Sequence, residues 1–367
     1  MIKRKSDKVM AGQSETNEAN ENAIFNKETE GLSQSQIILK RFVRHRAAMV
    51  ALFFFSTLVV VVYTALDWRI GDPRNPRFTI PGWWRYGFED MPDLSSEGCP
   101  DGTLGCPTID FVPFADGDGV GLGQHPFGQD NIGRDYFALV MRGAQRSILV
   151  MFIIGLIATT IGTVVGALAG FFRGWTEALL MRLVDFIITI PVIIIGSVIG
   201  FHFGNKGAAF LALLLGLFSW TGLSRLVRGE FLTLREREFV DAARVAGATN
   251  RRIIFKHILP NAIGVIIVSV TLLMSGAILL ETALSFLGFG VTSPDVSLGL
   301  LISNYQDAFT TRPWLFWYPG LFIIAIALCV NFIGDGLRDA FDPRQRRRLS
   351  KKDKANARQM QSRSELA

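Results

Sequence analysis

Two cysteines carry the clearest covalent chemistry in the sequence. Cys99 and Cys106 lie seven residues apart, and Pro100, Asp101 and Gly102 between them favour a turn that brings the two thiols together. In an oxidising compartment we expect a disulfide between them, and the alternative is two unpaired thiols. Their spacing does not fit a zinc site, because the usual pattern of four spaced ligands is missing.

Two ionisable residues are the other candidates for chemistry. His125 has several aspartates near it, but one histidine without spaced partner ligands is a weak metal site, and Pro126 and Gly128 indicate a structural turn instead. Glu281 ends an apolar run, where a charge is costly unless it meets protein or water. We expect Glu281 to line a substrate path or outer gate, or to reach the lipid headgroups.

ATP hydrolysis of the phosphate-binding-loop type is excluded for this chain. The phosphate-binding loop Gly-x-x-x-x-Gly-Lys-Ser/Thr is absent, and the sequence has no Gly-Lys pair at all. We therefore expect no catalytic residue, no metal site and no bound cofactor in the chain itself.

A polar segment, residues 236–260, has the pattern of a docking loop. Small apolar residues fall there on one face of a helix, at Phe239, Ala242, Ala243 and Ala246. Gly247 is placed to end that helix in a left-handed conformation. Thr249 or Asn250 then caps a second short helix, which we expect Pro260 to close.

The second short helix presents one side formed by Ile254, His257 and Ile258. The segment is thus predicted to be a helix–turn–helix with an exposed apolar edge. Such an edge on a polar loop most often marks the site of a docked partner.

Six apolar runs along the chain determine where the candidate residues above lie relative to a membrane. A helix needs about 20 apolar residues to cross roughly 30 Å of hydrocarbon, and 49% of the chain is hydrophobic with a mean hydropathy of +0.32. The runs are Ala47–Leu66, Ile148–Phe172, Phe186–Phe203, Ala208–Leu226, Ala262–Leu280 and Trp314–Ile333. The fold class is therefore an all-α integral membrane protein with six transmembrane helices.

Charge sets the orientation. Residues 67–147 hold 7 Lys/Arg against 12 Asp/Glu, whereas residues 225–256 hold 8 against 4 and residues 335–367 hold 10 against 5. Because positive segments stay inside, both termini and the 225–261 loop are expected in the cytoplasm. The basic run Arg346–Arg348 then faces anionic lipid rather than nucleic acid.

The predicted organisation has five parts. Residues 1–46 form a disordered cytoplasmic tail with a basic end, 47–66 the first transmembrane helix, and 67–142 an extracytoplasmic loop. Residues 143–336 form a five-helix core that contains the 225–261 loop, and 337–367 a basic cytoplasmic tail. The excursion 67–123 cannot be assigned a fold from its residues.

Three features inside the predicted spans lead to structural predictions. Glycines at 162, 166 and 170 form a smooth stripe, which fits either tight packing or a moving gate helix. Arg182 and Asp185 are one turn apart and are expected to pair with each other at the membrane interface. Pro191 is expected to kink the third span.

The docking loop resembles the cytoplasmic signature of ABC importer permeases, and the form His257–Asn261 is similar to that of the oligopeptide and dipeptide family. Asp241 replaces the usual Glu there, and His257 stands at an Ile position. The segment His125–Asp135 is similar to the outer-loop signature of that family, with Gln129 in place of Thr. Further similar segments are Leu284–Gly288, Gly334–Asp339 and Asp342–Arg344, so that the likeness runs from about residue 40 to 344.

This resemblance implies a type I ABC importer permease of the bacterial or archaeal cytoplasmic membrane that conducts peptides. It implies an external substrate-binding protein, a second related permease, and two ATPase subunits that hold ATP and Mg. The residues implied in ATPase coupling are Asp241, Ala242, Ala243, Gly247, Ile254, His257, Leu259 and Pro260.

Alternatives remain open. A permease for a metal chelate or another small solute shares these motifs. A secondary transporter would usually show internal repeats and broken helices, neither of which is evident in the sequence. A membrane-embedded enzyme would have to use His125, and neither of these last two classes explains the helix–turn–helix.

Overall fold

The computed structural model describes residues 34–341 except 73–74, 98, 100–103, 109–122 and 294. The chain divides into two compact units, Met1–His45 with Asp339–Ala367, and Arg46–Arg338. In the first unit, helix α2 (Gln34–Arg44) ends before His45, whose Nε2 lies 3.3 Å from the Asp339 carboxylate. The second unit contains the predicted core and the 67–142 loop.

Among the residues that the structure describes, four helices are long and apolar enough to cross a membrane. They are α3 (Arg46–Ala65), α4 (Tyr136–Phe172), α13 (Trp314–Phe341), and α11 (Leu259–Phe286) together with the turns that precede it. α4 runs without a break across the predicted loop–core boundary at 142/143.

Two further candidate spans are bent pairs of helices. α5 (Gly174–Ile188) joins α6 (Val192–Phe203) at an angle of 73°, and α7 (Ala208–Gly216) joins α8 (Thr221–Arg235) at 41°. A 3-10 turn, η1 (Gly204–Lys206), follows α6. Pro191 lies at the first bend, as predicted, because proline lacks the N–H and its ring blocks the preceding turn. The bend between α7 and α8 was not predicted, and the two bends remove one argument against a secondary transporter, namely that broken helices are not evident in the sequence.

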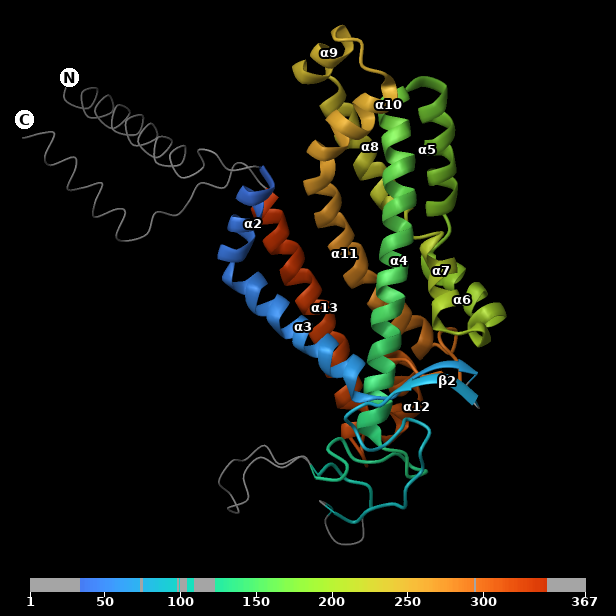
Figure 1. Cartoon of the computed structure of the whole chain (residues 1–367). Helices are drawn as coiled ribbons and strands as arrows, with labels where there is room; N and C mark the ends of the chain where they lie inside the picture. Colours follow the sequence, from blue (N-terminus) through green and yellow to red (C-terminus); the bar gives the residue numbers. More distant parts are fainter. Residues whose placement is uncertain are drawn as a thin grey trace, which may run out of the picture. The chain divides into compact units, whose positions relative to one another are not determined.

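α4 is the central element and packs against α8, α11 and α7 (Figure 1). The predicted glycine stripe is where α8 comes closest. A Cβ at Gly166 would lie 2.5 Å from the Ser224 carbonyl oxygen, and one at Gly170 would lie 2.7 Å from that of Arg228. Only glycine permits this backbone approach, so the stripe is a packing surface. A similar contact joins α13 to α11, where a Cβ at Gly334 would lie 2.3 Å from Thr271 Oγ1.

The loop before α4 contains a hairpin that the sequence did not predict. β1 (Trp68–Asp72) pairs antiparallel with β2 (Asn75–Ile80), in a register that sets Trp68 opposite Ile80. In the part of the chain that the structure describes, this is the one β-sheet, so the fold is helical with a single two-stranded addition. Farther along, Cys99 and Cys106 are joined as a disulfide.

The predicted ion pair between Arg182 and Asp185 was wrong. Asp185 instead accepts from Arg225 on α8 at 2.5 Å, and Glu177 on α5 pairs with Arg228 of the same helix. Carboxylates on α5 are therefore matched to arginines across the helix–helix contact rather than along their own helix.

Candidate functional site

The 225–261 segment begins as helix. Its first residues are the continuation of α8 to Arg235, and α9 (Glu238–Val245) follows after a short turn. Gly247 ends α9 with φ +78°, its N–H bonded to the Arg244 carbonyl and that of Ala248 to the Ala243 carbonyl. This pair of bonds is a Schellman motif, which needs the left-handed residue predicted at Gly247. The helix–turn prediction is confirmed here.

One side chain anchors α9 to the core, and the opposite face of the helix is exposed. Val240 is fully buried among Phe231, Ile253 and Ile258. The opposite face is open, with Phe239 39% and Val245 92% exposed, and Ala242 and Ala246 also exposed. We call the exposed residues Phe239, Ala242, Val245 and Ala246 the α9 surface.

Charge borders the α9 surface. Asp241 is exposed and forms an ion pair of 2.9 Å with Arg244 one turn later. A shallow hollow beside it is lined by Thr249, Arg251, Arg252 and Phe255, of which Phe255 is 59% exposed. The arrangement is an apolar centre with ionic groups at its edge, which is the usual composition of a protein docking surface.

The second helix differs from the prediction. Thr249 caps α10 (Asn250–Arg252) by accepting from the Arg252 N–H, but Pro260 does not end the helix. A π-helical turn, η2 (Ile253–Ile258), leads directly into α11, which has Pro260 in its first turn. The missing proline N–H is tolerated because the Leu259 N–H reaches back five residues to the Ile254 carbonyl.

This continuity changes the assignment of the predicted coupling residues. Ile254 is 5% exposed and Ile258 is fully buried, so both belong to the packed core and not to a docking edge. Leu259 packs against the same core and His257 is half-buried, while Pro260 is exposed. Of the predicted coupling residues, Asp241, Ala242 and Gly247 are therefore exposed, whereas Ile254 is buried in the core.

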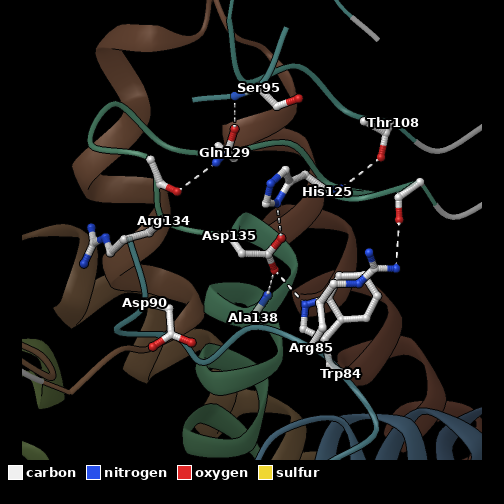
Figure 2. A network of polar contacts seen from close by, with 12 residues as sticks. Trp84, Arg85, Asp90, Ser95, Thr108, His125, Gln129, Arg134, Asp135 and Ala138 are labelled. Atoms are coloured by element: carbon white, nitrogen blue, oxygen red, sulfur yellow. Dashed lines mark hydrogen bonds and ion pairs between the residues drawn. The ribbon is translucent and has the colours of Figure 1, made fainter. Parts of the chain in front are cut away.

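At the opposite end of the unit, Asp135 holds the start of α4 (Figure 2). One carboxylate oxygen accepts from the Ala138 N–H at 2.8 Å and from Trp84 Nε1 at 2.9 Å. The other lies 2.7 Å from His125 Nδ1, whose ring stacks on Tyr86. Burial raises the pKa of the Asp135 carboxyl, and these hydrogen bonds oppose that rise. His125 is a structural partner of Asp135, as its turn residues suggested.

Glu281 is at neither of the two places expected from the sequence. Its side chain is 0% exposed and accepts from Ser147 Oγ at 2.9 Å and from Ser285 Oγ at 2.7 Å. Ser147 comes from α4, and Ser285 is also bonded to Ser297, the cap of α12 (Leu298–Tyr305). Here Glu281 neither lines an open path nor reaches headgroups, but joins α4, α11 and α12.

Among the described residues, no cluster of three or more His, Cys, Asp or Glu side chains is arranged to hold a metal ion. The sequence reasoning missed Val245 and Phe255, which an extended helical-face count would have included. It also missed the Trp84–Asp135 bond, for which a separation of 51 positions along the chain leaves no local signal.

Comparison with known proteins gives a family match that includes α9. Residues 162–347 match the family described as binding-protein-dependent transport system inner membrane component. The oligopeptide transport system permease protein OppC of Mycobacterium tuberculosis is 36% identical over 319 residues, covering 87% of this chain and 97% of that protein. The protein of the same name from Haemophilus influenzae is 35% identical, covering 86% and 91%.

A chain from inward-facing structures of the MetNI methionine ABC transporter is similar at 21% identity and TM-score 0.46, covering 56% of this chain and 96% of that chain. The family match spans half of the chain, and the curated relatives span nearly all of it. The chain therefore belongs to the family of binding-protein-dependent transport system inner membrane components, which are multi-pass permease subunits of ABC importers rather than enzymes.

Proposed function

We propose that this chain forms half of the translocation path of a peptide importer driven by separate ATPases. The observation that carries the proposal is the α9 surface. It presents Phe239 and Val245 to solvent on a helix that Val240 fixes to the core. An exposed apolar surface on a firmly anchored helix fits a partner that must push on it.

The connection from α9 to the core supports a mechanism. We place the α9 surface in the cytoplasm, with both chain termini, on the charge pattern of the sequence. Closure of the ATPases around ATP would displace α9. η2 continues into α11 without a break, and α11 packs on α4 and α12, so this displacement would reach the core as a rigid-body movement.

The assembly we propose has five kinds of component. Two ATPase subunits hold ATP and Mg, and one of them docks on the α9 surface, with Asp241 and Gly247 fixing its contact. A second, related permease completes the path, and an extracytoplasmic substrate-binding protein delivers the substrate. Lipid of the cytoplasmic membrane surrounds the two permeases.

Peptides are the substrate class that we propose, because relatives covering most of this chain are named for oligopeptide or peptide transport. A metal chelate is the competing cargo. Permeases for either cargo share these motifs, so the cargo is assigned by the transport experiment below.

The test is reconstitution. The chain is co-expressed with the permease, ATPases and secreted binding protein encoded beside it, and the purified complex is placed in vesicles. We expect ATP-dependent uptake of short peptides and ATP hydrolysis that rises when the peptide-loaded binding protein is added. Uptake of chelates without peptides would assign the other cargo. Uptake that needs an ion gradient but no ATP would show a secondary transporter.

A further inference from the structure

The ion pairs between α5 and α8 leave one arginine of α5 without a partner. Arg182 was expected to pair with Asp185, but Asp185 pairs with Arg225 of α8. Among the residues that the structure describes, Arg182 is exposed and has no hydrogen bond or ion pair. We call Arg182, Asp185 and Arg225 the charged cluster. Two arginines against one aspartate give it a net charge of +1.

The neighbouring acidic side chains do not neutralise the charged cluster. Glu177, the other acid of α5, pairs with Arg228. The sequence of α4 contains no acidic residue. In α8 the acid is Glu230, and at 100° per residue it lies about 140° around the helix from Arg225, on another face. The helices that pack on α5 therefore leave the positive charge of Arg182 for a ligand.

The charged cluster lies at the depth of the hydrocarbon layer. The apolar run 148–172 of α4 is about 37 Å long, so a layer of about 30 Å leaves at most roughly 7 Å of it outside. α5 begins at Gly174, beside the end of that run, and Arg182 and Asp185 follow about 12 and 16 Å farther along. Because α5 runs beside α4 (Figure 1), both charges lie several ångströms inside the layer.

Two exposed arcs of α5 differ in composition. Arg182 and Asp185 lie one turn apart on the first arc. The second arc, about 100° farther around the helix, carries Leu179, Leu183 and Phe186, which are 59%, 48% and 67% exposed. A charge that faces hydrocarbon is costly, whereas these apolar side chains suit it. The apolar arc therefore faces lipid, and the charged cluster faces water or protein.

Water is the surrounding that suits the charged cluster. The Asp185 and Arg225 side chains are 51% and 47% exposed. A second permease packed permanently over them would take an arginine and an ion pair out of water, which is unfavourable unless new partners replace that water. A path that opens to water keeps all three side chains hydrated between one cargo molecule and the next.

We propose that the charged cluster lines the translocation path and that Arg182 binds the carboxylate end of a peptide during its passage. A guanidinium presents two parallel N–H donors to a carboxylate, and every linear peptide has such a group whatever its sequence. Asp185 keeps Arg225 as its partner, so it does not compete for Arg182. The inference rests on the proposed function, since it takes the cargo to be a peptide.

Disulfide capture tests the inference in the full reconstituted complex, with Cys329→Ala as the background. Ala178 is exposed one turn before Arg182, so Ala178→Cys places a thiol beside the guanidinium. The matched control is Leu183→Cys, which adjoins Arg182 in the sequence but lies on the apolar arc. The probes are the tripeptides Ala-Ala-Cys and Cys-Ala-Ala. Each is loaded to equal occupancy on the secreted binding protein encoded nearest to this chain, and ATP is added with a mild oxidant.

We expect Ala178→Cys to capture Ala-Ala-Cys at least fivefold more than Cys-Ala-Ala, because a carboxylate on Arg182 brings the C-terminal residue next to the thiol. Addition of Arg182→Gln to that variant removes the preference. Addition of Arg182→Lys retains part of it, because an ammonium group also attracts a carboxylate. The Leu183→Cys control captures neither peptide above background.

Three capture results would overturn the inference: equal or no capture of the two peptides by Ala178→Cys, a preference that survives Arg182→Gln, or capture by Leu183→Cys as strong as that by Ala178→Cys. A thiol at position 178 that reacts only after the second permease is removed would also overturn it, because that permease would then be the occupant. A wild-type complex that takes up neither peptide would instead refute the proposed function. The two failures are therefore distinguishable.

Discussion

Replacement of Gly247 tests the turn on which the α9 surface depends. No atom lies within 4 Å of the position that a Cβ would take, so a side chain there meets no steric obstacle from its surroundings. The cost comes from the backbone alone, because φ is +78°. A residue with a Cβ in this left-handed conformation loses about 1–2 kcal/mol, which changes a conformational equilibrium roughly 5- to 30-fold.

The structure predicts an ordered series. Gly247→Asn is tolerated, since asparagine visits the left-handed region readily. Gly247→Ala destabilises the left-handed turn by about 1–2 kcal/mol. Gly247→Val destabilises it further, because a β-branched side chain restricts the backbone more strongly. The control is Gly229→Ala in the interior of α8, where a Cβ also meets nothing within 4 Å and helix propensity improves by about 1 kcal/mol.

The measurement is ATPase retention on purification, together with peptide uptake in vesicles. We expect both to fall in the order Asn, Ala, Val at equal levels of inserted protein, and the α8 control to match the wild type. Full uptake by Gly247→Val, or equal losses by the asparagine and valine variants, would refute the claim that backbone conformation at this turn positions the docking helix.

Three further outcomes follow from the packing. Intact-mass analysis without reductant is expected to show Cys99 and Cys106 two hydrogens short, and two freely alkylated thiols would contradict the disulfide. Gly166→Ala is expected to cost about 1–3 kcal/mol by separating α4 from α8 and to lower the melting temperature in detergent, whereas Gly222→Ala, with nothing within 4 Å, leaves it unchanged. Glu281→Leu leaves two buried serine hydroxyls without their acceptor and is expected to destabilise the protein by about 2–5 kcal/mol, whereas Glu281→Gln keeps an acceptor and costs less. A leucine variant as stable as the wild type would refute the structural role of Glu281 in joining α4, α11 and α12.

Local signals in the sequence predicted a large part of this fold. Four of the six apolar runs are continuous helix and the other two are bent helix pairs, and the bend at Pro191 and the left-handed Gly247 were identified from single residues whose backbone limits are strict. These features depend on a few neighbouring residues, so one sequence is enough to find them.

Features that depend on distant partners were not predicted. The Ser147 hydroxyl donates to the Glu281 carboxylate, 134 positions away in the sequence. Asp185 forms its ion pair with Arg225 on α8 and not with Arg182 on its own helix. Pro260 has the usual appearance of a helix end, but burial of Ile254 and Ile258 rewards continuation of the helix through a π turn. Here tertiary packing outweighs local preference.

The uninterrupted helix from Asn250 to Phe286 has a mechanical consequence. It has 37 residues, so it is a rod about 55 Å long, and Gly334 of α13 touches it at Thr271. With this contact taken as the pivot, the rod has arms of roughly 32 Å and 22 Å. A push on the longer arm swings the other end in the opposite direction, about two-thirds as far. The force needed at the α9 end is correspondingly smaller than the force delivered at Phe286, and spin labels at the two ends would record opposite displacements during ATP hydrolysis.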